Sequence, residues 1–366
     1  MHENYSNIEI LFLILTITVG FGVISLPKSI AEVAGTGGWF TLLLTTIIAM
    51  IVNYMVISLA YSNSEETLYD YSKKLLGKKL TLIVACIYAF DFFLLPTFVL
   101  RNTSEIIKHS ILLKTPTWIL TLVFLIVIGY ALNRGIKTIS LVCQIYGIIF
   151  ILSGVISSIF IFTKGDIYNI LPIFDIDSIG AYTKGIFTKS AIFSFMGIEF
   201  ISFIPLSKKK NKNISKYAFW ITGFIGLLYI LVFESSIAIM GVHDIVFYKD
   251  SVIATIRRVE LPFLQFLGRL DGIFTISWLS SIFCTSALYF YGSVHFIGKI
   301  FKGRINKKVI IFIVMVIAFI SSEIPRTVDA AENMIEFISY FGLSTYIIIP
   351  FILLILSNIK KNKKNI

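Results

Sequence analysis

The chain has 366 residues, of which 57% are hydrophobic and 14% are charged, and its mean hydropathy is +0.87. Average soluble domains carry about 25% charged residues, so this composition excludes a soluble globular protein and indicates a multispanning membrane protein. The formal net charge is +11, but the basic residues collect in short connections between apolar runs, which favours a role in membrane orientation over nucleic-acid binding.

The apolar runs approach the ~20 residues that a helix needs to cross a hydrocarbon core of ~30 Å. They predict an all-α membrane protein that forms a single integral membrane domain over residues 1–366. Its ten predicted transmembrane helices cover residues 9–34, 38–61, 80–106, 117–132, 139–163, 185–206, 217–241, 268–297, 308–323 and 333–357.

Lys and Arg are concentrated in alternate connections, at 73–79, 134–137, 208–216 and 299–308, and in the tail at 360–364. The positive-inside rule therefore places both termini in the cytoplasm. Two longer connections, 164–185 and 241–266, fall on the opposite side, and in the second of them we expect short helices over the outer mouth.

Glycine and proline interrupt the first and sixth predicted spans at corresponding positions. The sequence GFG occupies 20–22 and is followed by Pro27, whereas Gly197 lies at a similar depth in span six and is followed by Pro205. The two spans are five apart, so the pattern predicts an inverted-repeat transporter fold with discontinuous helices 1 and 6. Its repeats would cover about 9–163 and 185–357.

A helix that unwinds at bilayer depth frees N–H and C=O groups that lipid cannot satisfy. The N-terminus of a half-helix suits a carboxylate, and the C-terminus of a half-helix suits an ammonium group. A zwitterionic amino acid offers both charges. The alternative is that these glycines serve only the close packing of membrane helices.

Three segments resemble signatures of the B subunits of spore germination receptors, the spore permease family. They are GVISLPKSIAEVAGTGGWF (22–40) in span one, FSFMGIEFISFIPLSKKKN (193–211) in span six and RLDGIFTISWLSSIFCTSALYFY (269–291) in span eight. The resemblance extends over the whole chain. One departure is Lys28, where the family signature often has Arg, which loses the planar bidentate fork.

This resemblance implies membership of the amino acid–polyamine–organocation transporter superfamily, with a LeuT-like 5+5 inverted repeat. It implies a nutrient-sensing subunit of a spore germinant receptor, which lies in the inner membrane of the endospore. The implied partners are the receptor A and C subunits, the lipid bilayer and a small nutrient ligand, often an amino acid.

The residues expected to bind the ligand come from the two breaks and from the spans that border them. They are Gly20, Phe21 and Gly22 of span one, Ser194, Phe195, Met196, Gly197 and Glu199 of span six, Asp91 of span three, and Thr275 and Trp278 of span eight. Buried charges in membrane spans are functional candidates because they are costly.

Some of these roles remain open at the level of sequence. Glu199 suits a ligand or proton role, or a structural pair with Lys28 or Lys189. Phe195 is either a gate over the ligand or an ordinary packing aromatic. Arg101 and Glu105 are spaced i, i+4 and are interpreted as a plain surface pair.

Neither an enzyme nor a cofactor or metal site is expected. The sequence has no P-loop and no metal-binding His pair, and its three cysteines are scattered through apolar spans. Three functions remain: a receptor that senses a nutrient, a self-sufficient secondary amino acid transporter that works by alternating access, and a scaffold or ion-conducting element that binds no nutrient.

Overall fold

The computed structural model describes residues 5–186, 191–259 and 270–364, and within them all regular secondary structure is helical. The α-helices are α1 (Asn7–Gly22), α2 (Leu26–Ala34), α3 (Gly38–Ser62), α4 (Leu68–Ser110), α5 (Thr117–Arg134), α6 (Ile136–Lys164), α7 (Ile179–Gly185), α8 (Ile214–Ile245), α9 (Ser251–Arg258), α10 (Leu270–Ile300), α11 (Lys307–Ser322), α12 (Val328–Leu343) and α13 (Ile349–Lys364). The 3₁₀ segments are η1 (Gly35–Gly37), η2 (Ile167–Ile170), η3 (Ile176–Ser178), η4 (Ile192–Phe195) and η5 (Ile198–Phe203), and η6 (Ser344–Ile348) is π-helical.

Seven helical segments of the described chain are long and apolar enough to cross a membrane, so the protein is a multi-pass membrane protein. Two further apolar segments, α1 and Ile192–Phe203, are shorter. They coincide with predicted spans one and six, whose breaks shorten them. The predicted number of ten spans stays a prediction, since the lengths support seven directly.

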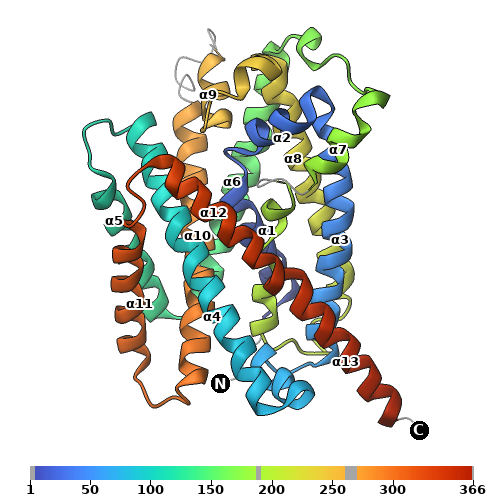
Figure 1. Ribbon diagram of the computed structural model, residues 1–366, viewed down its shortest axis with the longest axis vertical. Coiled ribbons are helices and arrows are strands. Elements are labelled where there is room, and N and C mark those ends of the chain that lie inside the picture. Colours follow the sequence, from blue (N-terminus) through green and yellow to red (C-terminus); the bar gives the residue numbers. More distant parts are fainter. Residues whose placement is uncertain (1–4, 187–190, 260–269, 365–366) are drawn as a thin grey trace.

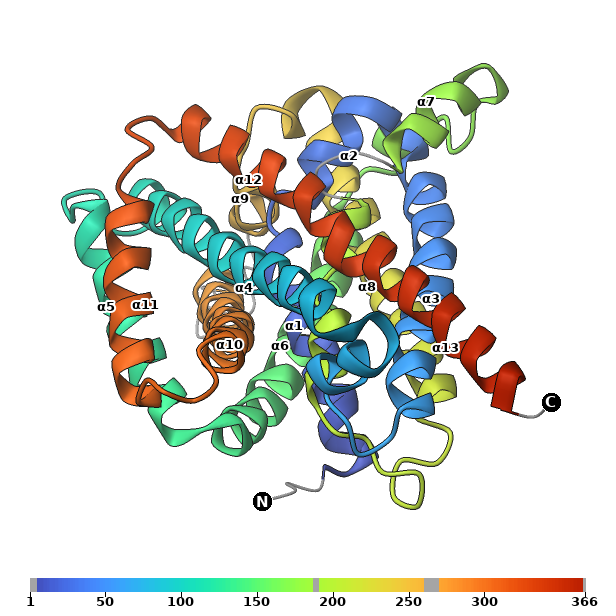
Figure 2. The same ribbon diagram turned by 60° about the horizontal axis from the view of Figure 1, so that its bottom comes forward.

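The first and sixth spans occupy the middle of the helix bundle (Figure 1). α1 packs against α6, α8 and α10, and also against η4 and η5. The pairs α4 with α10 and α3 with α8 form the main body around this centre, and α5 packs with α11 at one side (Figure 2). The helices α2, α7 and α9 lie at the end of the bundle opposite the start of α1 (Figure 1).

Local sequence explains where α1 begins and ends. Ser6 and Glu9 form a capping box, in which Ser6 Oγ accepts from the Glu9 N–H and Glu9 Oε2 accepts from the Ser6 N–H. At the other end, Pro27 has no N–H, and its ring would clash with the carbonyl of Val23 in a continuous helix. The helix therefore ends at Gly22 and restarts as α2, with Pro27 in its first turn.

Other helices carry interruptions of their own. The backbone of Gly77 has φ 80°, which separates the first two turns of α4 from its long apolar part. The π-helical segment η6 joins α12 to α13, and π-helical insertions recur at functional sites. The connection at 241–266 contains a short helix, α9, as expected, and the connection at 164–185 also contains short helical segments, η2, η3 and α7.

Candidate functional site

The break in the first span lies at residues 23–25, between α1 and α2. Neighbouring elements satisfy part of the backbone that it frees. The Ile24 carbonyl oxygen accepts from Ser251 Oγ at 2.9 Å and from the Val252 N–H at 3.3 Å, both at the start of α9. The connection between α8 and α10, which contains α9, therefore caps this break directly.

The sixth span breaks at Gly197, between η4 and η5. Gly197 has φ 120°, a backbone conformation that favours glycine. Its N–H donates to Glu199 Oε2 at 2.9 Å, and the Tyr289 hydroxyl on α10 donates to Glu199 Oε1 at 3.2 Å. Glu199 is fully buried and therefore acts here as a local cap of the broken segment.

The two broken spans touch each other at their glycines. A Cβ added to Gly22 would lie 2.0 Å from Ser194 Oγ, and a Cβ on Gly197 would lie 3.0 Å from the Ile17 side chain. The Tyr229 hydroxyl on α8 joins both segments, 2.9 Å from the Ser194 carbonyl oxygen and 3.2 Å from the Thr18 carbonyl oxygen. The close packing of the two spans thus requires both glycines, and the backbone angle at the second break requires Gly197.

Removing the Tyr229 hydroxyl is expected to loosen this junction. Tyr229→Phe deletes the hydroxyl whose single proton the Ser194 and Thr18 carbonyl oxygens share but keeps the ring that packs on Phe195. A hydrogen bond contributes about 1 kcal/mol net, and buried carbonyls left without a partner cost about 1–3 kcal/mol. We expect a lower thermal midpoint in detergent than for wild type, and an unchanged midpoint would contradict the bridging role.

A cavity of about 410 Å³ lies beside the two breaks. It is lined by the end of α1, the 23–25 break, α2, η4, α4, α10 and α12. Five of the residues expected at the ligand site line it: Phe21, Gly22, Ser194, Met196 and Trp278. The indole N–H of Trp278 is buried and has no hydrogen-bond partner within the described chain.

Charged side chains also line this cavity. Lys28 Nζ lies 3.6 Å from Glu32 Oε1 within α2, and Lys249 Nζ lies 3.0 Å from Glu332 Oε1 on α12. Glu336 of α12 lines the cavity as well. The cavity therefore has a small, mostly apolar region beside the breaks, and side chains of both positive and negative charge along α2 and α12.

The other six expected residues lie off the cavity lining. Gly20 is inside continuous α1, where a Cβ would meet Thr285 Oγ1 at 2.0 Å, so it serves packing. Phe195 packs edge-on against Tyr229 with ring centroids 5.2 Å apart, and Thr275 donates to the Asp271 carbonyl. Gly197 and Glu199 form the break itself. Asp91 is fully buried on α4 and contacts Thr345.

Among the described residues, Glu199 forms no ion pair with Lys28. Lys28 pairs with Glu32, and Lys189 lies outside the described residues. Glu199 instead bonds to Gly197 and Tyr289, as described above.

Sequence reasoning missed the contribution of α12 and of the C-terminal half of α4. Asn102, Thr103, Glu332 and Tyr340 all line the cavity. No glycine, proline or other local pattern distinguishes these positions, since they reach the site only through the packing of distant helices.

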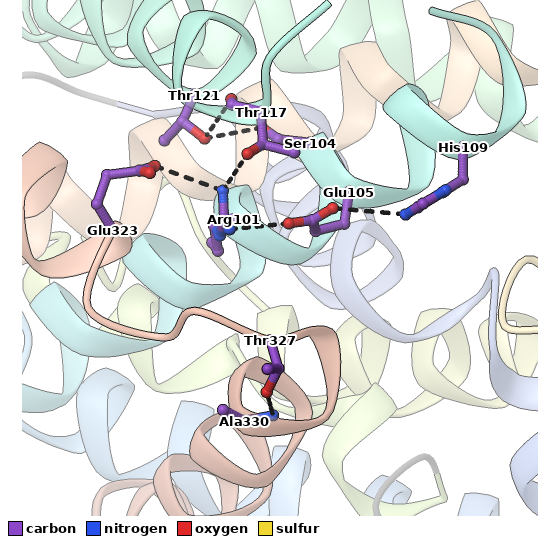
Figure 3. Close-up of polar contacts among 9 residues, drawn as sticks. All are labelled: Arg101, Ser104, Glu105, His109, Thr117, Thr121, Glu323, Thr327 and Ala330. Carbon is purple, nitrogen blue, oxygen red and sulfur yellow. Dashed lines mark hydrogen bonds and ion pairs between the residues drawn. The ribbon is translucent and has the colours of Figure 1, made fainter. Parts of the chain in front are cut away.

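The prediction that Arg101 and Glu105 form a plain surface pair is wrong. They are 6% and 7% exposed, because α5 and the end of α11 cover this face of α4. Arg101 Nη2 lies 2.8 Å from Glu105 Oε1, and Nη1 lies 3.5 Å from Glu323 Oε1 and donates to Thr117 Oγ1 (Figure 3). The guanidinium thus joins three helical regions of the described chain.

One solved structure shows the same fold. It is a Na⁺-coupled sialic acid symporter in a substrate-bound outward-open state, which matches with a TM-score of 0.63. The match covers 92% of this chain and 77% of that chain at 11% sequence identity. The architecture is therefore LeuT-like.

Comparison of sequences identifies relatives over nearly the full length. Spore germination protein YndE of Bacillus subtilis is 25% identical over 95% of this chain and 95% of its own length. Spore germination protein GerLB of Bacillus cereus is 24% identical over 98% and 96%, respectively, and spore germination protein B2 of Bacillus subtilis is 23% identical over 96% and 95%. Residues 5–331 match the family described as "Spore germination protein", the spore permeases, and the chain therefore belongs to this family.

Proposed function

We propose that this protein is the nutrient-sensing subunit of a spore germinant receptor, and that it binds an amino acid beside its two broken helices. The observation that carries the proposal is the cavity of about 410 Å³, which Gly22 of the first break and Ser194 of the sixth segment both line. A cavity of this size suits a small molecule.

The chemistry of the lining supports a zwitterionic ligand. Phe21, Met196 and Trp278 offer apolar surface, and the indole N–H of Trp278 offers a donor for a carboxylate oxygen. The ion pairs of Lys28 and Lys249 with glutamates place both signs of charge along the same cavity. In this proposal the ligand contacts the residues that line the cavity. The expected residues that lie off the lining support the broken segments without touching the ligand: Gly20, Phe195, Gly197, Glu199 and Thr275.

Signalling requires that the ligand bind one arrangement of the helices more tightly than another. The proposed movement involves α2, which lines the cavity and whose start is bound to α9. The germinant receptor A and C subunits would read this movement in the inner membrane of the endospore, with both termini of this chain on the cytoplasmic side. The single membrane domain would contain the two repeats, at about 9–163 and 185–357.

A second candidate is a self-sufficient secondary transporter. The LeuT-like architecture, shared with a symporter, favours it because that fold permits alternating access. Both candidates use the same cavity, so a measurement must separate them.

The test uses the purified full-length chain reconstituted in lipid vesicles and a mixture of ¹⁴C-labelled amino acids. The receptor predicts saturable binding without accumulation inside the vesicles. Accumulation against a gradient would establish the transporter instead. If no label binds to the wild type and none promotes germination of spores that carry it, amino acid sensing is refuted.

A further inference from the structure

Asp91 is a carboxyl group buried in the middle of α4 without a cationic partner. The residue is 0% exposed, and among the described residues it forms no ion pair. Its Oδ2 lies 2.7 Å from Thr345 Oγ1 in the π-helical segment η6, whereas Oδ1 has no hydrogen-bond partner within the described chain. An ionised carboxylate in such surroundings is costly unless something neutralises it.

The Thr345 hydroxyl lies within hydrogen-bond distance of two acceptor oxygens. Its Oγ1 lies 2.7 Å from Asp91 Oδ2 and 2.8 Å from the Gly342 carbonyl oxygen, but a hydroxyl has only one proton to donate. If Asp91 is ionised, the single hydroxyl proton can lie in only one of these two contacts, and the other contact brings two acceptor oxygens together without a hydrogen between them. If Asp91 carries a proton, the carboxyl donates to Oγ1, the hydroxyl donates to the Gly342 carbonyl, and both contacts are hydrogen bonds.

Within the described residues, no cationic side chain contacts Asp91. The titratable residues near Asp91 are Glu199 on η5, Tyr88 on α4 and Tyr289 on α10. Glu199 differs from Asp91, because each of its oxygens accepts from a separate donor, the Gly197 N–H and the Tyr289 hydroxyl. The Tyr88 hydroxyl is already committed to the Thr345 carbonyl oxygen at 2.7 Å.

We propose that Asp91 is a proton-binding site, and that its proton holds α4 against η6. One proton binds to the carboxylate and forms the carboxylic acid, with no other change in bonding. When the proton leaves, the Thr345 hydroxyl must turn to Asp91, and the Gly342 carbonyl loses that donor. Asp91 then supports the fold as a protonated group rather than as a contact of the nutrient.

The proton site adjoins the nutrient cavity. A Cβ added to Gly342 would lie 2.4 Å from Met196 Cε and 3.2 Å from Asp91 Oδ1, so these two atoms are neighbours across Gly342. Met196 also lines the cavity. A ligand that displaces Met196 therefore changes the surroundings of Asp91, and by reciprocity the proton changes the affinity for that ligand. This last link depends on the proposed function, but the proton site itself does not.

Infrared spectroscopy of the purified full-length chain in lipid vesicles tests the site without any nutrient. The difference between wild type and Asp91→Asn should contain the C=O stretch of a protonated carboxyl, shifted in D₂O. Glu199→Gln, which alters the neighbouring buried carboxyl, should leave that band in place. A difference spectrum that contains carboxylate bands instead would overturn the proposal.

A second variant guards against poor folding of Asp91→Asn. Thr345→Val removes the acceptor of the carboxyl proton, so the protonated band should persist and shift to higher frequency. Thermal midpoints give an independent readout, since the wild-type midpoint should fall at high pH by an amount that Asp91→Asn lacks. A midpoint that rises with sodium in wild type but not in Asp91→Asn would identify a metal cation, not a proton, as the occupant.

Discussion

Under the proposed function, replacing Gly22 with alanine is expected to shift the nutrient dose response of spores to much higher concentrations. The new Cβ would lie 2.0 Å from Ser194 Oγ, 2.7 Å from Ser194 Cβ and 3.1 Å from Ser194 Cα, so a rotation of the serine side chain does not relieve the clash. The two broken spans must move apart at the edge of the cavity. Overpacking of this kind costs about 1–3 kcal/mol, which corresponds to roughly fivefold to more than a hundredfold in ligand affinity.

The measurement is the nutrient dose response of spores that carry the variant, together with the amount of protein in their membranes. Gly154→Ala is the matched control, because a Cβ at this glycine of α6 meets no atom within 4 Å. The double variant Gly22→Ala with Ser194→Gly should recover part of the response. A normal dose response in Gly22→Ala would refute the assignment of the cavity.

Replacing Arg101 with methionine is expected to lower the stability of the folded protein strongly. Arg101→Met removes the cation that contacts Glu105 and Glu323 and leaves the 7% exposed Glu105 carboxylate without that partner. Breaking a buried ion pair from one side costs about 3–5 kcal/mol. We expect a clear drop in the thermal midpoint of the purified protein and a lower yield of folded chain.

A comparison of single and double variants separates the effect of the buried charge from the effect of side-chain packing. The double variant Arg101→Met with Glu105→Leu removes both buried charges and should be more stable than Arg101→Met alone, because replacing a whole buried pair by apolar groups is often neutral. Lys74→Met is the control, since it breaks the ion pair with Glu66 at an exposed position and should change little. If Arg101→Met is as stable as this control, the buried pair contributes nothing.

Sequence reasoning found the broken helices because their cause is local. Pro27 forbids the i→i−4 bond of a continuous helix, and Gly197 supplies a backbone angle that other residues rarely adopt. Their five-span separation then predicted an inverted-repeat transporter fold. The LeuT-like form of that fold came from the resemblance to the spore permease family. The position of the first break was less predictable: Gly20 and Gly22 lie inside α1, and the helix ends only after them.

The rest of the site depends on contacts between residues far apart in the chain. The burial of Arg101 follows from α5 and α11, and the contact of Asp91 with Thr345 joins α4 to η6. Spacing along one helix cannot reveal either. An i, i+4 ion pair has the same sequence pattern on an exposed helix face as on a face that other helices bury. This explains the error at Arg101 and Glu105.

The two halves of the first span, α1 and α2, are bound to different parts of the chain. The start of α1 is held by Glu9, which pairs with Lys137, and by Asn211, whose amide donates to the Tyr5 carbonyl. The start of α2 follows α9 through Ser251. A displacement of α9 would therefore be transmitted to α2 across the three-residue joint at 23–25, whereas α1 keeps its own separate attachments.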